Sequence, residues 1–172
     1  MVQLRLAEAG EAELVAEISR ETFYDTFAVH NTVADMDKFM AEQFSKEQLV
    51  EEFSQAGHCF FLAWVDDIPA GYIFLKNKSH QALGPVSAME ISRLYVRKPF
   101  IGKGIGKLLM QKAIAFAEQE QKEWIWLGVW EDNQPAIDFY TAFGYEKFSE
   151  HEFILGDDVQ LDWLMKRSLI QA

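Results

Sequence analysis

Three glycines spaced two residues apart, Gly102, Gly104 and Gly106, form the segment of this chain best suited to bind a phosphate. They follow a predicted strand and open a predicted helix. Glycines let the backbone pass close to a ligand with its N–H groups turned outward, and a helix N-terminus carries about half a positive charge. Lys103 and Lys107 add positive charge to the same turn. The sequence therefore predicts binding of a phosphate or pyrophosphate group.

Two well-known phosphate loops do not fit this segment. A Walker A loop requires G-x-x-x-x-G-K-[ST], but only three residues separate Gly102 from Gly106, and Leu108 stands where a hydroxyl is needed. A dinucleotide loop requires G-x-G-x-x-G, but Lys107 occupies the place of the third glycine. A tight turn into a helix, without a ligand, is the alternative for this segment taken alone.

The strand before the glycines, residues 89–96, changes the phase of its apolar side chains. They occupy odd positions up to Ile91 and even positions from Leu94 onward. Because side chains alternate strictly along a regular strand, the change predicts a β-bulge near Ser92 and Arg93. A bulge splays a strand from its neighbour and is common beside active sites. A strand that ends and restarts is the alternative.

The elements that must position these residues alternate between strands and helices. This order predicts an α/β protein with a mixed sheet, and residues 124–130, apolar on both faces, predict an interior strand covered on both sides. Residues 77–87 are expected to form a loop. Strands are expected at 2–6, 58–66, 69–76, 89–96, 124–130, 145–154 and 159–166, and helices at 11–27, 33–53, 104–119 and 135–143.

The composition limits the classes of protein that fit. The chain has 172 residues, with 27 Asp and Glu against 16 Lys and Arg, so its formal net charge is −11. We expect a single domain, 1–172, and no nucleic-acid partner, because phosphate backbones are held by clustered Lys and Arg. No apolar run approaches the ~20 residues of a membrane-spanning helix. One cysteine, Cys59, permits no intrachain disulfide, and the four histidines lack ligand spacing. We expect a cytoplasmic protein that has no membrane partner and binds no metal.

Two segments together resemble a known family. Residues Ile101-Gly102-Lys103-Gly104-Ile105-Gly106 resemble the acyl-CoA pyrophosphate loop of the GNAT superfamily (Gcn5-related N-acetyltransferases), [QR]-x-x-G-x-[GA], with Ile101 replacing the usual Gln or Arg. About 30 residues later, Asn133 to Tyr140 resembles the second signature, N-x-x-A-x-x-F-Y, and Gly144-Tyr145 resembles its Gly-Phe or Gly-Tyr exit. The chain is identified from these motifs as a member of that superfamily.

The resemblance extends over nearly the whole chain. Residues 21–27, 90–96, 126–131 and 156–158 resemble the PaiA-type bacterial spermidine and spermine N-acetyltransferases. The resemblance implies the GNAT fold, a mixed seven-stranded sheet flanked by about four helices with a β-bulge splay on the fourth strand. It also implies direct transfer of an acetyl group from acetyl-CoA, the cosubstrate, to a small primary amine, without a covalent intermediate or a metal. A polyamine such as spermidine or spermine is the expected acceptor.

This reaction has two requirements for proton transfer. An alkylammonium with a pKa of ~10.4 must lose its proton before it attacks, at a cost of ~4.6 kcal/mol at pH 7. The resemblance implies that Glu90 takes this proton, directly or through water, and that Tyr140 protonates the departing CoA thiolate. An ordinary glutamate on a strand face is the alternative for Glu90. The alternative for Tyr140 is an ordinary core residue, because Ile137, Tyr140 and Phe143 recur at helical spacing.

The resemblance also assigns the residues that bind the two substrates. The backbone of Leu94, Tyr95 and Val96 should pair with the pantetheine arm, residues 101–107 should hold the pyrophosphate, and Asn133 should bind pantetheine unless it only caps a helix. The acceptor is assigned to Glu21, Tyr24, Asp25, Trp130 and His151. An acidic row that includes Glu21 and Asp25 is typical of a solvated helix face, which is the alternative for those two residues.

Two other functions stay open at this point. The chain could acetylate an amino group of a peptide or protein, or it could be a catalytically inactive acyl-CoA-binding regulator. Retention of Glu90 and Tyr140 favours an enzyme. The resemblance allows a homodimer, and the sequence does not reveal the oligomeric state, the acceptor or the range of acyl chains.

Overall fold

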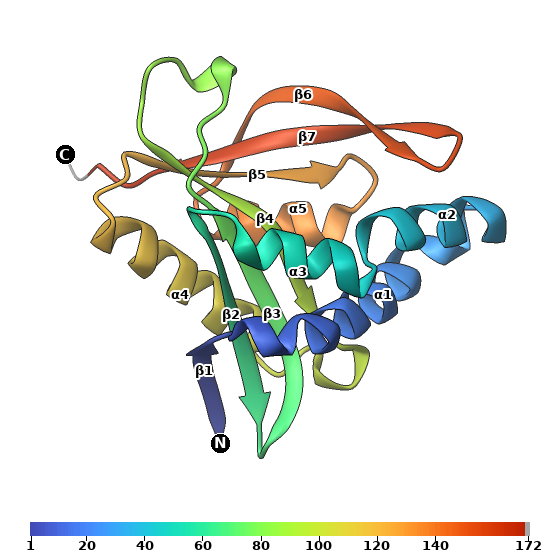
Figure 1. Cartoon of the computed structure of the whole chain (residues 1–172). Helices are drawn as coiled ribbons and strands as arrows, with labels where there is room; N and C mark the ends of the chain where they lie inside the picture. The colour runs from blue at the N-terminus through green and yellow to red at the C-terminus, as the bar shows by residue number, and fades with distance from the viewer. Residues whose placement is uncertain (171–172) are drawn as a thin grey trace.

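The computed structural model describes residues 1–170, and its centre is a seven-stranded sheet in the order β1-β2-β3-β4-β5-β7-β6 (Figure 1). Neighbouring strands are antiparallel except β4 and β5, which run parallel. The predicted mixed sheet is therefore confirmed. The strands are β1 (Val2–Leu6), β2 (His58–Val65), β3 (Ile68–Lys76), β4 (Ala88–Val96), β5 (Trp124–Trp130), β6 (Glu146–Leu155) and β7 (Asp158–Ser168).

Helices cover both faces of the sheet, and the two larger buried cores lie beneath them (Figure 1). One core lies between the sheet and the first three helices, and the other lies under the last two. No helix in residues 1–170 is both long enough and apolar enough to cross a membrane. The helices are α1 (Ala12–Phe27), α2 (Val33–Gln43), α3 (Lys46–Ser54), α4 (Ile105–Gln119) and α5 (Gln134–Ala142).

The helical segment expected at 33–53 is two helices, so the sheet carries five α-helices where about four were expected. The helical conformation is interrupted at Phe44, which is buried, and at Ser45. The Ser45 hydroxyl accepts a hydrogen bond from the Gln48 N–H at 3.1 Å and caps the N-terminus of α3. This local bond favours a new helix over continuation of α2.

The predicted bulge lies in β4. Phe74 of β3 pairs with Arg93, but the next residue, Leu75, pairs with Ile91, so Ser92 is the extra residue. On its other side β4 pairs with β5 only over four residues, 88–91. Beyond Ile91 the two strands separate, and the edge of β4 from Ser92 onward has no partner in β5. The bulge and the splay that it was expected to produce are both present.

Position 71 of β3 requires glycine, because the backbone of β4 passes very close to it. A Cβ built at this position would overlap the carbonyl oxygen of Tyr95. We predict that Gly71→Ala lowers the free energy of unfolding by about 1–3 kcal/mol, measured by urea denaturation, because the strands must move apart. Gly10→Ala is the matched control, since nothing lies within 4 Å of a Cβ there. Equal losses in the two variants would contradict this explanation.

Candidate functional site

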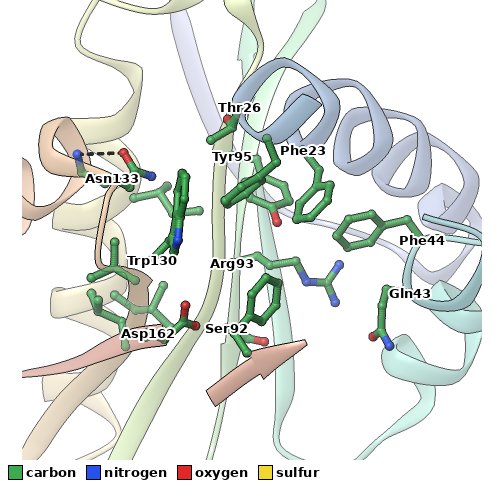
Figure 2. A pocket seen from close by; sticks show the side chains of 18 of the residues that line it. Phe23, Thr26, Gln43, Phe44, Ser92, Arg93, Tyr95, Trp130, Asn133 and Asp162 are labelled. Carbon is green, nitrogen blue, oxygen red and sulfur yellow. Dashed lines mark hydrogen bonds between the residues drawn. The ribbon is translucent and has the colours of Figure 1, made fainter. Parts of the chain in front are cut away.

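A cavity of about 370 Å³ lies at the opening between β4 and β5. Figure 2 shows Trp130 and Asp162 on one side of it and Phe23, Phe44 and Gln43 on the other. The bulged part of β4 lies between these two sides. The cavity therefore joins the splayed edge of the sheet to the face that α1, α2 and α3 cover.

The wall on the helical side is largely aromatic. The rings of Phe23 and Phe39 stack with centroids 4.4 Å apart, and Phe39 contacts Phe153 of β6 at 5.5 Å. The ring of Phe27 packs near that of Trp130, with the two centroids 5.4 Å apart. Such a wall can bury hydrocarbon, and the faces of aromatic rings also attract cations.

Arg93, the residue after the bulge, is fixed by a buried polar network. Its guanidinium forms an ion pair with Glu52 of α3 and donates a hydrogen bond to the Tyr72 hydroxyl at 3.1 Å. The Tyr72 hydroxyl in turn shares a hydrogen bond with Ser19 of α1 at 2.6 Å. The positive charge of Arg93 is thus neutralised inside the protein, and the network ties β4 to two helices.

Tyr140 of α5 lines the cavity. The ring packs against Phe139 and Tyr145, with centroid distances of 5.6 and 6.0 Å. Burial raises the pKa of Tyr140 to about 12. The hydroxyl is therefore protonated at neutral pH and can donate a proton or a hydrogen bond to a group in the cavity.

Glu90, the predicted proton acceptor, lies beside the cavity and not in its wall. It pairs across the sheet with Lys76, which does line the cavity, so both side chains are on the same face. The Glu90 Oε1 is buried and has no hydrogen-bond partner among the described residues. Transfer of a proton from the cavity to Glu90 would need a bridging water.

Asp162 of β7 is a carboxylate in the cavity wall that sequence reasoning missed. It lies between Trp130 of β5 and His151 of β6 in the sheet. Burial raises its pKa to about 6, and the nearby His151 limits the rise. Strand alternation was a usable signal, because it places Asp162 on the same face as the buried Leu164.

Asp162→Asn is expected to stabilise the fold above about pH 6 and to have little effect near pH 4. With its raised pKa, the folded chain binds this proton more tightly than the unfolded chain does, so stability falls as pH rises from about 4 to 6. Asparagine removes the buried charge. Because solvent at the cavity screens the carboxylate, we expect the free energy of unfolding to rise by only about 1 kcal/mol at pH 7.5, which corresponds to an increase of about 2–4 °C in Tm. An unchanged Tm in thermal melts at that pH would contradict the burial cost.

The glycine-rich turn before α4 has the backbone geometry expected of a phosphate loop. Gly102 and Gly104 both have φ of 83°, a conformation that favours glycine. The first bond of the helix runs from the Leu108 N–H to the Gly104 carbonyl at 3.1 Å, so the amides up to Lys107 have no partner within the helix. The side chains of Ile101, Lys103 and Lys107 are exposed.

Asn133 is both a helix cap and a residue of the cavity wall. Its Oδ1 accepts a hydrogen bond from the Ala136 N–H at 3.4 Å and caps α5 (Figure 2). The same residue also lines the cavity. Among the predicted pantetheine-binding strand residues, Leu94 and Tyr95 line the cavity, and Val96 lies just beyond them on β4.

The predicted acceptor residues are only partly brought together. Trp130 is in the cavity wall, and His151 lies beside Asp162 but outside the wall. Three residues of α1 lie outside the cavity and are exposed: Glu21, Tyr24 and Asp25. Glu21 forms an ion pair with Arg97 at 2.8 Å. In the described part of the chain, no three His, Cys, Asp or Glu side chains are grouped so as to hold a metal ion.

Comparison with known proteins identifies the family. Residues 15–145 match the model of the acetyltransferase (GNAT) family. The chain is 39% identical over 178 residues to an uncharacterized N-acetyltransferase in the pepI 3′ region of Lactobacillus delbrueckii subsp. lactis, which covers 99% of this chain and 100% of that one. It is 26% identical over 149 residues to a spermidine N(1)-acetyltransferase of Thermoplasma acidophilum, 84% of this chain and 88% of that one.

A solved structure gives the same result for the fold. The crystal structure of PaiA N-acetyltransferase from Thermoplasma acidophilum in complex with coenzyme A has a TM-score of 0.79 to this chain. The likeness covers 98% of this chain and 99% of that one, at 22% sequence identity. The two chains therefore share the same overall fold. The chain belongs to the GNAT family of acetyltransferases.

Proposed function

We propose that this N-acetyltransferase transfers an acetyl group from acetyl-CoA directly to a small primary amine, and that the amine is a polyamine such as spermidine or spermine. The observation that carries the proposal is the cavity itself. Its wall includes Tyr140, the open edge of β4, a set of aromatic rings and the Asp162 carboxylate. An enzyme that uses acetyl-CoA is expected to work in the cytoplasm.

The splay between β4 and β5 offers a binding surface for the cosubstrate. The backbone of Leu94, Tyr95 and Val96 has no partner in β5, so the amide groups of pantetheine can pair with it as an added strand would. The pyrophosphate would then lie on the amides of residues 102–107, with Lys103 and Lys107 close by. Asn133, at the start of α5, would contact pantetheine from the other side of the opening.

The chemistry follows from the groups around this opening. The neutral amine nitrogen attacks the thioester carbonyl carbon, and a backbone N–H of β4 would stabilise the oxyanion that forms. The C–S bond then breaks, and Tyr140 donates its proton to the departing sulfur. Glu90 stays the predicted proton acceptor for the ammonium and would act through a water, because it lies outside the cavity wall.

A polyamine suits both the cavity and the charge of the protein. It alternates ammonium groups with short methylene chains, and the cavity wall combines Asp162 with the rings of Phe27 and Trp130. A relative is named a spermidine N(1)-acetyltransferase. The net charge of −11 would also attract a cation at low salt, although screening over ~8 Å limits this effect at physiological ionic strength.

Release of the CoA thiol from acetyl-CoA, measured with a panel of amines, tests the proposal. We expect spermidine and spermine to stimulate release above the rate of hydrolysis, and mass spectrometry to show one added acetyl group on the amine. The panel should include monoamines of similar length and lysine-containing peptides. Stimulation by peptides but not by polyamines would overturn the polyamine assignment. Tight binding of CoA without release for any amine would favour a regulator.

A further inference from the structure

We propose that Asp162 is the carboxylate that binds the ammonium group of the acceptor and takes its proton directly. The inference rests on the proposed function, because it assigns a role within the same reaction. It differs from the prediction for Glu90 in one physical respect. Asp162 lies in the cavity wall, whereas Glu90 lies outside it.

The other charged groups of the cavity are already engaged. Glu52 and Arg93 form a buried ion pair, and the Lys76 ammonium lies 5.4 Å from the centre of the Phe74 ring. Asp162 forms no ion pair with a Lys or Arg in residues 1–170, and the titratable side chain beside it on β6 is His151. The other titratable groups that share the cavity with Asp162 are Tyr95 and Tyr140. Of the two carboxylates in the wall, Asp162 is therefore the one available to a ligand cation.

Gly128 gives a ligand access to this carboxylate. It lies in β5 between Trp126 and Trp130, which share its face of the strand, and it lines the cavity. A Cβ at this position would lie 3.5 Å from Oδ2 of Asp162 and 3.6 Å from Cε1 of His151. Because glycine carries no side chain, a hollow remains over the strand beside the carboxylate. An ammonium group entering from the cavity can reach Asp162 through this hollow.

The proton balance of the reaction is then complete within the cavity. An N–H bond of R–NH₃⁺ breaks and its proton moves to the Asp162 carboxylate, leaving the nitrogen lone pair free. The amine attacks the thioester, the C–N bond forms and the C–S bond breaks. Sulfur takes the proton of Tyr140, and the phenolate recovers a proton from the nitrogen of the newly acetylated amine. Asp162 finally releases its proton to solvent, so one proton is produced for each acetyl group transferred.

The dependence of kcat/KM on pH tests this assignment in the wild type and in Asp162→Asn. With an alkylamine, the wild-type value should level off above a pH of about 6, where Asp162 is ionised. Without the carboxylate, the reaction must wait for amine that is already neutral. We therefore expect kcat/KM of Asp162→Asn to be lower by about 100-fold at pH 7 and to rise about tenfold per pH unit up to pH 9.

A second amine separates the loss of proton transfer from general damage. Trifluoroethylamine is largely neutral at pH 7, because its fluorines lower the pKa of the ammonium. Its acetylation by Asp162→Asn should fall less than about tenfold. Asp37→Asn, which removes the same charge from an exposed position on α2, should match the wild type throughout. Equal losses with both amines would overturn the role in proton transfer.

Glu90→Gln decides between the two carboxylates. If Glu90→Gln shows the rising pH profile and Asp162→Asn levels off like the wild type, the proposal is wrong. If the wild type acetylates no amine, the proposed function fails, and calorimetric binding of spermidine to the CoA-loaded protein then tests Asp162 by itself. Binding lost in Asp162→Asn would support the ammonium site, and equal binding in both proteins would overturn it.

Gly128→Val provides a variant that leaves the carboxylate in place. Its methyl groups would fill the hollow beside Asp162. We expect KM for the amine to rise by about tenfold or more, with the Kd for CoA unchanged, because only the acceptor loses space. An unchanged KM would show that the acceptor does not reach Asp162 over Gly128.

Discussion

Glu52→Ala is expected to lower the free energy of unfolding by about 3–5 kcal/mol. The variant leaves the Arg93 guanidinium buried without its counter-ion, and the side chains of both partners are nearly inaccessible in the wild type, at 10% and 13% exposure. An unpaired buried charge costs more than the lost attraction, because the group cannot regain its hydration. Urea denaturation monitored by circular dichroism measures the change.

Two further variants show that the loss comes from the unpaired charge. Glu51→Ala changes the neighbouring exposed residue of α3 and should cost less than about 0.5 kcal/mol. The double variant Glu52→Ala with Arg93→Met removes both charges and should be more stable than Glu52→Ala alone. A double variant that is less stable than the single one would contradict the explanation.

Tyr140→Phe should reduce kcat by about tenfold or more, because phenylalanine keeps the ring but cannot protonate the departing thiolate. The Kd for CoA should not change, since the ring packing against Phe139 and Tyr145 remains. Burial raises the pKa of the wild-type phenol to about 12, so this acid stays protonated at every pH used in an assay. Release of the CoA thiol, with calorimetry for CoA binding, gives both quantities.

Tyr145→Phe is the matched control for this prediction. Its hydroxyl contacts the Met110 sulfur at 3.3 Å inside the core, and its ring centre lies 6.0 Å from that of Tyr140. Loss of this phenol should leave turnover nearly unchanged. If Tyr140→Phe turns over at the wild-type rate, Tyr140 has no role as an acid and serves only to pack the cavity wall.

Features that depend on local sequence could be predicted well. The phase change of apolar residues before Leu94 indicated either a bulge or a strand that ends and restarts, and the structure has the bulge. The glycines before α4 indicated its start for a similar reason, since their backbone angles suit few other residues. The break at Ser45 was missed, because the apolar spacing continues from α2 into α3 and hides a single capping bond.

Features that depend on the order of strands could not be predicted. Strand alternation indicates which face of β7 carries Asp162, but nothing local in the sequence specifies that β7, and not β6, lies next to β5 and so brings that face to the cavity. The same limit applies to α1. Its pattern shows which side chains are exposed, including Glu21 and Asp25, but not which exposed side adjoins the cavity.

The separation of β4 from β5 leaves few backbone hydrogen bonds between the two halves of the sheet. Four paired positions, from Ala88 to Ile91, join the half containing β1–β4 to the half containing β5, β7 and β6. A cosubstrate lying along the opening would contact both halves and hold them together. It would therefore slow deuterium exchange at the backbone amides on both sides of the opening. The rigidity of the protein would then report how much cosubstrate is bound, even before an acceptor amine is identified.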